Sequence, residues 1–136
     1  MQPQDVKAVN VSVSGDDKPL VSVFVSHDGL ITRQGSAALD SSENTLYTGK
    51  TDDPILQRLL SKIDTRLLNK GGSYTIPVKG VPCTLKIHFE GMNENTHIEV
   101  TFGSESADLP ADVYDVLMAA IEVTEDWYQA QVRAAE

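Results

Sequence analysis

Apolar and polar residues alternate with a period of two along several stretches of the chain. In residues 6–14 the valines at 9, 11 and 13 fall on one side and the asparagine and serines on the other, which is the pattern of a strand with one buried face. Residues 20–26 and 30–34 are rich in β-branched and aromatic side chains and predict two more strands. Residues 45–48 predict a short fourth strand.

Turn-forming residues separate these predicted strands. Glycine, two aspartates, lysine and proline at 15–19 predict a hairpin turn between the first two strands. A three-residue loop at 27–29, with Gly29 in the left-handed conformation, would place Val25 opposite Ile31 and Val23 opposite Arg33. The stretch 35–44 is small and polar, and we expect it to form a mobile loop.

The apolar period changes to three and four residues in the middle of the chain. This spacing predicts an amphipathic helix, which Thr51, Asp52, Asp53 and Pro54 would open and Gly71 with Gly72 would close. Its apolar stripe consists of Leu56, Leu59, Leu60, Ile63 and Leu67.

A second amphipathic helix is predicted near the C-terminus, opened by Asp108 or Leu109 with Pro110. We expect Trp127 to continue its buried stripe and Tyr128 to flank that stripe, so that one of the two is exposed at the edge. With Tyr114 on the other side of the helix, these aromatic residues could anchor a partner. The stripe consists of Val113, Val116, Leu117, Ala120, Ile121, Thr124 and Trp127.

Between the two helices the alternation returns. Residues 73–78 predict a short strand, and the prolines at 77 and 82 bracket 78–81 as a turn or an edge. Residues 83–90 and 96–102 predict a hairpin with its loop at 91–95. For the two apolar sets to share a face, His88 must lie opposite either His97 or Glu99. In either register both histidines lie on the polar face.

These elements follow the order ββββαβββα. We therefore expect an α+β fold, a two-layer sandwich whose mainly antiparallel sheet of about six to seven strands is covered on one face by two amphipathic helices. The chain of 136 residues predicts a single domain over residues 1–136, with 1–5 and 129–136 as frayed ends.

Charge narrows the range of partners. Eleven lysines and arginines against 20 aspartates and glutamates give a formal charge of -9, which repels nucleic acid and anionic membranes. This charge would speed encounter with a basic protein, although acidity of this kind often serves only solubility. The single cysteine, Cys83, fits a reducing compartment, and neither a signal peptide nor a membrane-spanning apolar run is present. We expect a soluble cytoplasmic protein.

Few residues suggest chemistry. His88, His97 and Glu99 could approach one another on the hairpin as metal ligands or an acid–base pair, but a solvated sheet face shows the same alternation. His27 and Asp28 form a pair found in metal-dependent phosphohydrolases, but their place beside Gly29 favours a turn. Cys83 follows Pro82 at a strand start and lacks an activating neighbour. The sequence predicts no catalytic residue, metal or cofactor.

Three functions remain open. The first is a non-enzymatic protein-interaction module of the inhibitor, immunity or adaptor type, which would use the loop 35–44 or the polar face of the hairpin, where we also expect the acidity of the chain to lie. The second is a small enzyme or ligand-binding domain with a pocket between sheet and helices that uses His88, His97 and Glu99. The third is a structural or oligomeric role, as monomer or homodimer, through an exposed edge of the first or fourth strand. The candidate binding residues on the hairpin are Lys86, His88, Glu90, His97 and Glu99.

Overall fold

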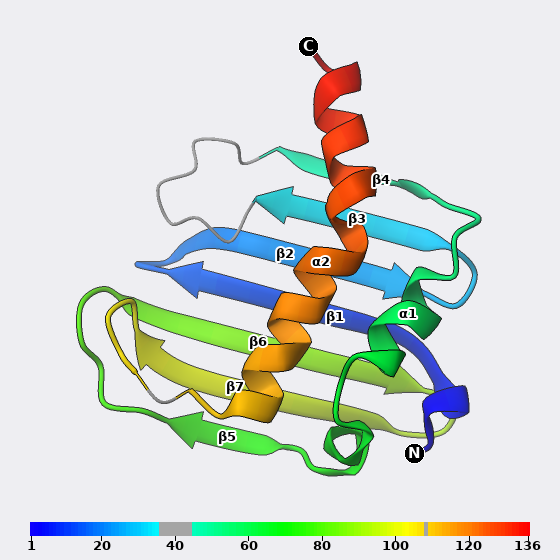
Figure 1. Cartoon of the computed structure of the whole chain (residues 1–136). Coiled ribbons are helices and arrows are strands. Elements are labelled where there is room, and N and C mark those ends of the chain that lie inside the picture. The colour runs from blue at the N-terminus through cyan, green and yellow to red at the C-terminus, as the bar shows by residue number, and fades with distance from the viewer. Residues whose placement is uncertain (36–44, 108) are drawn as a thin grey trace.

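The computed structural model describes residues 1–35, 45–107 and 109–136. Within these residues seven strands form one sheet in the order β4-β3-β2-β1-β6-β7-β5, and two α-helices cross one of its faces (Figure 1). Neighbouring strands are antiparallel except β5 and β7, which are parallel. The strands are Val6–Gly15 (β1), Lys18–Ser26 (β2), Leu30–Gly35 (β3), Leu46–Lys50 (β4), Gly72–Thr75 (β5), Pro82–Gly91 (β6) and Asn95–Gly103 (β7).

The predicted fold class and the order of elements are confirmed. The predicted pairings of Val25 with Ile31 and Val23 with Arg33 are also found. Gly29 has a φ of 88°, the left-handed conformation that the β2–β3 turn requires. The predicted loop at 35–44 and the helix start at Asp108 lie outside the described residues, apart from Gly35, which ends β3.

The first helix is shorter than its apolar stripe predicts. The helix α1 spans Ile55–Ser61, and a separate 3-10 helix follows at Thr65–Asn69. The Asp64 carboxylate accepts the Arg66 N–H and caps this second element. Leu67 is buried as predicted, but from the 3-10 helix rather than from α1.

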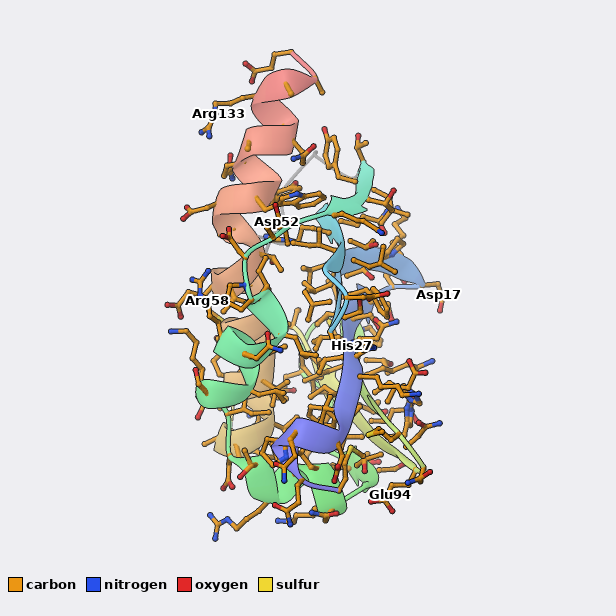
Figure 2. The ribbon with its side chains drawn as sticks, turned by 90° about the vertical axis from the view of Figure 1, so that its right-hand side faces the viewer. Asp17, His27, Asp52, Arg58, Glu94 and Arg133 are labelled. Atoms are coloured by element: carbon orange, nitrogen blue, oxygen red, sulfur yellow. The ribbon has the colours of Figure 1, made fainter. Side chains whose placement is uncertain are left out.

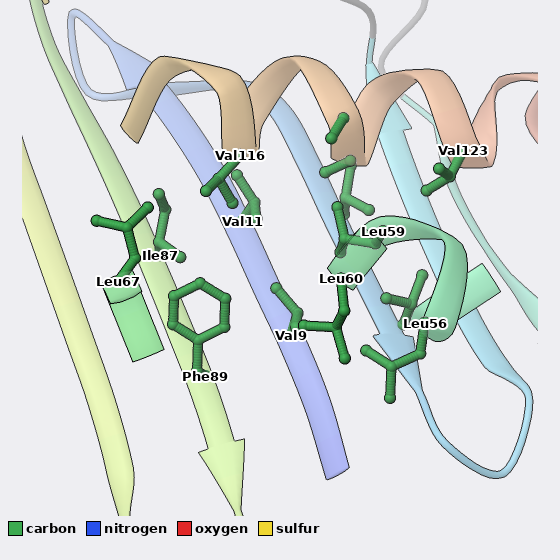
Figure 3. Packing of buried hydrophobic residues seen from close by; sticks show 14 of the residues in the cluster. Val9, Val11, Leu56, Leu59, Leu60, Leu67, Ile87, Phe89, Val116 and Val123 are labelled. Atoms are coloured by element: carbon green, nitrogen blue, oxygen red, sulfur yellow. The ribbon is translucent and has the colours of Figure 1, made fainter. Parts of the chain in front are cut away.

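Both helices pack on the same face of the sheet, and α2 spans Ala111–Ala134. Figure 3 shows Leu59 of α1 and Val116 of α2 above Val11 and Ile87 of the sheet, and all four side chains are buried. Burial of this apolar surface is the main source of stability for such a layered fold.

Two predictions about exposure are wrong. The first strand is not an edge, because β1 lies between β2 and β6; among the described strands β4 and β5 form the edges. Tyr128, rather than Trp127, is fully buried, because its ring packs against Tyr47 of β4 at a centroid distance of 5.9 Å. Trp127 is half-buried and contacts the strand at Gly49.

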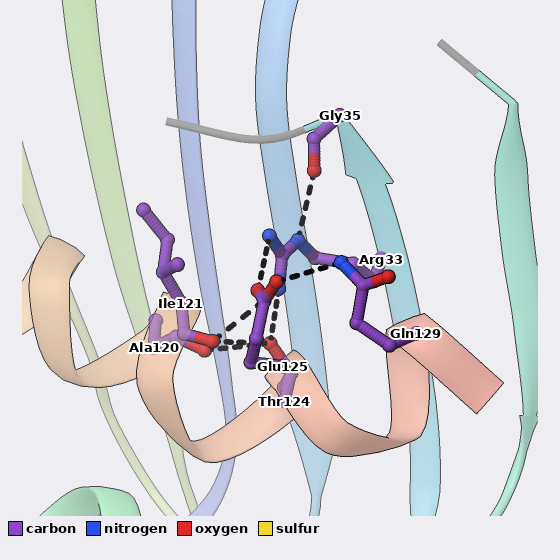
Figure 4. Close-up of polar contacts among 7 residues, drawn as sticks. All are labelled: Arg33, Gly35, Ala120, Ile121, Thr124, Glu125 and Gln129. Carbon is purple, nitrogen blue, oxygen red and sulfur yellow. Dashed lines mark hydrogen bonds and ion pairs between the residues drawn. The ribbon is translucent and has the colours of Figure 1, made fainter. Parts of the chain in front are cut away.

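One charged residue, Arg33, lies in the core with no exposed surface. Its Nε donates to the Gly35 carbonyl at 3.0 Å, and its Nη1 donates to Thr124 Oγ1 at 3.1 Å (Figure 4). Its Nη2 lies 3.0 Å from a Glu125 carboxylate oxygen, an ion pair that lacks hydrogen-bond alignment. The guanidinium carbon also lies 4.3 Å from the centre of the Tyr128 ring. These contacts offset the cost of burying the charge.

Candidate functional site: the open face of the sheet

The face of the sheet opposite the helices carries no described helix, and we call it the open face. Figure 2 shows the molecule from the side, with α1 and α2 on one side of the sheet only. The open face follows from the period-two pattern, because every strand residue that turns away from the core projects there. On β1, β2 and β6 it includes Asn10, Ser12, Ser14, Ser22, Phe24, Ser26, Thr84, Lys86, His88 and Glu90.

One row of paired residues crosses six strands of the open face. At about 4.8 Å per strand, its five steps span about 24 Å. Polar side chains occupy every position in this row except that of Phe24. From β4 to β7 the row consists of Thr48, Thr32, Phe24, Asn10, His88 and His97.

The structure brings the five predicted binding residues together on two neighbouring strands. His88 lies opposite His97, with ring centres 6.0 Å apart, so the register with Glu99 opposite His88 is excluded. Glu99 instead lies opposite Lys86, whose Nζ is 3.9 Å from a carboxylate oxygen of Glu99. Glu90 lies opposite Asn95.

The hairpin residues of the open face are arranged for non-covalent contact with a partner. Among the described residues no group of three His, Cys, Asp or Glu side chains is placed to hold a metal ion. Lys86 and Glu99 are both partly exposed, and an ion pair of this kind contributes about 0–1 kcal/mol, so either group can exchange its partner at low cost.

The predicted pocket between the sheet and the helices does not contain the predicted residues. His88, His97 and Glu99 lie on the open face, whereas the helices cover the opposite face. None of His88, His97 and Glu99 lines any of four hollows in the described part of the chain. The largest of these four, of about 750 Å³, lies beside α1 and the start of β1 and is lined by Lys7, His27 and other residues.

The other two candidate sites lie in a turn and in the core. The His27–Asp28 pair lies in the β2–β3 turn, where Gly29 N–H donates to the Ser26 carbonyl. A hydrogen bond from the Ser26 hydroxyl lowers the pKa of Asp28. Cys83 is buried, and this burial raises the pKa of its thiol, which disfavours the reactive thiolate.

Sequence reasoning missed the apolar part of the open face. Phe24 alternates with Ser22 and Ser26, so the period of β2 already placed it there. Leu30 on β3 is 40% exposed, and together with Phe24 it lines a shallow hollow whose other open-face members are Thr32, Thr48 and Lys50.

The prediction that the acidity of the chain lies on the polar face of the hairpin is wrong, because more of the excess negative charge lies on α2. Glu90 and Glu99 on the open face are balanced by Lys50 and Lys86, whereas α2 carries five carboxylates and one arginine. The carboxylates of α2 belong to Asp112, Asp115, Glu122, Glu125 and Asp126.

Comparison with known proteins assigns no function. No protein-family model matches this sequence, and no curated protein matches it either. In the described part of the chain no helix is long and apolar enough to span a bilayer.

Proposed function

We propose that this protein is a non-enzymatic interaction module, of the inhibitor, immunity or adaptor type, that docks onto a protein partner through its open face. The observation that carries this proposal is the row of short and aromatic side chains that crosses six strands without a described helix above it. A face about 24 Å wide in one direction is of the scale needed to bury about 800 Å² per partner, the usual size of a stable interface.

The composition of the open face favours binding. Serine, threonine and asparagine lose less side-chain entropy than lysine or glutamate when they are immobilised, and they offer donors and acceptors to a partner. Phe24 provides a central apolar anchor, and His88 and His97 add two amphipathic rings beside Asn10. The net charge of -9 favours a basic partner by long-range attraction.

A capture experiment tests this proposal. Tagged wild-type protein and a Phe24→Lys variant are used to capture partners from the native lysate, and each captured protein is then purified and titrated by calorimetry. We expect Phe24→Lys to weaken binding by at least about tenfold, because it removes the central anchor. Val78→Lys serves as the control, because Val78 is 48% exposed and lies outside the sheet.

An enzymatic result would overturn the proposal. The purified protein is assayed with a broad panel of hydrolase substrates, alongside His88→Ala and His97→Ala. Turnover that both substitutions abolish would identify the open face as a catalytic surface. We expect neither the wild type nor the variants to show turnover.

A second candidate function, small-ligand binding, is favoured by the hollow of about 750 Å³, which lies in the size range of ligand sites. Leu56 and Leu60 of α1 form part of its apolar wall, and Lys7 and His27 supply polar groups. Screening a metabolite library by thermal shift tests this candidate. A genuine ligand would raise the Tm of the wild type but not that of Lys7→Ala, whereas no shift with any compound would count against it.

A further inference from the structure

Two of the three histidines in the chain, His88 and His97, form a cross-strand pair at the β7 end of the row on the open face. Further along the same ladder, the Gly91 N–H donates to the carbonyl of the opposite residue, Glu94, at 2.9 Å. Hydrogen-bonded and non-hydrogen-bonded pairs alternate along an antiparallel ladder, so His88 and His97 form a non-hydrogen-bonded pair. The Cα atoms of such a pair are about 4.5 Å apart rather than about 5.5 Å, which brings the side chains close together.

The two imidazoles are near enough to bind one metal ion between them. Their ring centres are 6.0 Å apart, and the ring planes meet at 56°. A tetrahedral ion with metal–nitrogen bonds of about 2.0–2.1 Å would hold the two ring centres about 5 Å apart. The χ2 torsion of histidine has a broad range, and His97 is exposed while His88 is half-buried. Rotation of the side chains therefore closes the difference without movement of the strands.

The immediate neighbours of the pair favour a cation. Glu90 and Glu99 each lie two residues from one of the histidines on the same face of the sheet. One ammonium opposes these two carboxylates, because the Lys86 Nζ lies 3.9 Å from a Glu99 carboxylate oxygen. Asn10, which pairs with His88 on β1, is neutral. The excess of one carboxylate attracts a positive ion to the pair.

The chemistry of imidazole selects the class of ion. Imidazole nitrogen suits divalent first-row transition metals such as Zn²⁺, Ni²⁺ and Cu²⁺, whereas Mg²⁺ and Ca²⁺ prefer oxygen ligands. The second imidazole adds affinity because it binds intramolecularly once the first holds the ion. In the described part of the chain no third His, Cys, Asp or Glu is placed to complete a metal site, so water fills the remaining positions.

We propose that His88 and His97 form a binding site for a divalent transition-metal ion, which one nitrogen of each imidazole and water molecules coordinate. This inference goes beyond the proposed function, because the ion needs no protein partner in order to bind. The site lies on the open face, where Asn10 separates His88 from the apolar anchor Phe24.

Calorimetric titration with Ni²⁺ tests the proposal. Protein without a purification tag is titrated at pH 7.5, alongside His88→Ala and His97→Ala, and the series is repeated with Zn²⁺. We expect one ion per chain and a loss of affinity of at least about tenfold in each variant, because a single imidazole cannot chelate the ion. Titration with Mg²⁺ should give no binding.

His27→Ala is the matched control. It removes the third histidine, which lies in the β2–β3 turn outside the pair. We expect the Ni²⁺ affinity to change by less than about twofold, because an isolated imidazole adds little to a chelated site.

Paramagnetic broadening provides a second measurement that needs no substitution, and it decides the matter if circular dichroism shows an alanine variant to be poorly folded. Cu²⁺ is added below stoichiometry to the wild type, and the histidine ring protons are followed by nuclear magnetic resonance after their assignment. We expect the resonances of His88 and His97 to broaden together, at Cu²⁺ concentrations that leave His27 sharp, because Cu²⁺ binds imidazole tightly.

Several results would overturn the inference: Ni²⁺ affinity that a folded His88→Ala or His97→Ala variant retains, an equal loss in His27→Ala, equal binding of Mg²⁺, or broadening of all three histidines alike. Phe24→Lys should leave the Ni²⁺ affinity within about threefold of the wild type, because the added charge is distant and screened. Capture of a partner in the presence of a chelator tests the open face without any metal ion, so failure of the metal site and failure of docking are separate outcomes.

Discussion

The same strands build two faces with opposite requirements. On β1, Val9, Val11 and Val13 point to the helices and are fully or almost fully buried, whereas the polar residues between them project from the open face. The covered face must exclude water and must provide a hydrogen-bond partner for every polar group that is buried in it. The open face has no such requirement, so its residues are available to a partner.

Arg33 and Lys86 illustrate the difference between the two faces. Arg33, on the covered face, has hydrogen bonds to Gly35 and Thr124 and an ion pair with Glu125. Lys86, on the open face, has one loose ion pair with Glu99 at 3.9 Å. A charge in the core thus has a fixed structural role, and a charge on the open face has an exchangeable partner.

The largest predicted effect is that of Arg33→Ala. We expect the free energy of unfolding to fall by about 3–5 kcal/mol, because the substitution leaves a cavity beside Tyr128 and removes the partner of buried polar groups. Urea denaturation followed by circular dichroism measures the change. Lys86→Ala is the matched control and should change stability by less than about 0.5 kcal/mol. Similar losses of unfolding free energy in the two variants would show that a charge on the covered face has no greater structural role than a charge on the open face.

Ile87→Ala and His88→Ala compare neighbouring residues that point to opposite faces of β6. Ile87 is fully buried, so its truncation should cost about 2–5 kcal/mol, whereas His88→Ala should stay within about 0.5 kcal/mol. Urea midpoints of the two variants provide the measurement. A large loss of stability in His88→Ala would mean that the pair of histidines stabilises the sheet. That result would contradict the expectation that His88 is available to a partner.

Thr124→Val and Thr32→Val make the same chemical change on the two faces. The buried Thr124 hydroxyl donates to the Ala120 carbonyl and accepts from Arg33. Its loss should cost about 1–2 kcal/mol, because the Arg33 Nη1 keeps only its longer contact with the Ile121 carbonyl. Thr32 lies on the open face, and valine suits a strand, so Thr32→Val should be neutral within about 0.5 kcal/mol. Thermal unfolding of both variants tests this contrast.

Periodicity was sufficient to predict the fold class, because burial on one side of a strand or helix leaves a repeating pattern in the sequence. It could not predict where the first helix ends. Ile63 and Leu67 keep helical spacing across the break, although Asp64 is a good N-cap residue and marks the start of a second element. The position of β5 as a parallel edge strand depends on a connection through the 3-10 helix, which no local pattern encodes.

The candidate site was predictable to a similar degree. The alternation placed His88, His97 and Glu99 on one face, but the choice between the two registers depended on the geometry of the hairpin turn. The reversal of Trp127 and Tyr128 arises where α2 crosses β4, because Tyr128 meets Tyr47 and Arg33 there. Leu117 and Ile121 line a hollow beside α2, but the sequence pattern could not distinguish them from the buried residues of the same stripe.

The smallest predicted effect concerns Asp64 and Arg66, the counterpart of the pair that the buried Arg33 forms with Glu125. Hydrogen bonds from the Arg66 side chain and backbone, at 2.7–3.2 Å, lower the pKa of Asp64 to about 2. A carboxylate whose pKa is lower in the folded state than in the unfolded state, where it is 3.8, stabilises the fold above pH 4. That contribution disappears as the pH falls from about 4 to about 2.

Asp64→Asn isolates this effect, because asparagine keeps the N-cap but removes the charge. We expect the wild type to have the higher urea midpoint at pH 6, and the difference between the two proteins to vanish as the pH approaches 2. Because Arg66 is largely exposed, added salt should also reduce the difference at pH 6. Equal urea midpoints of the two proteins at pH 6 would show that the cap, which asparagine keeps, and not the ion pair, is what Asp64 contributes. The corresponding difference in urea midpoint between the wild type and Glu125→Gln should be far less sensitive to salt, because Arg33 is shielded from solvent.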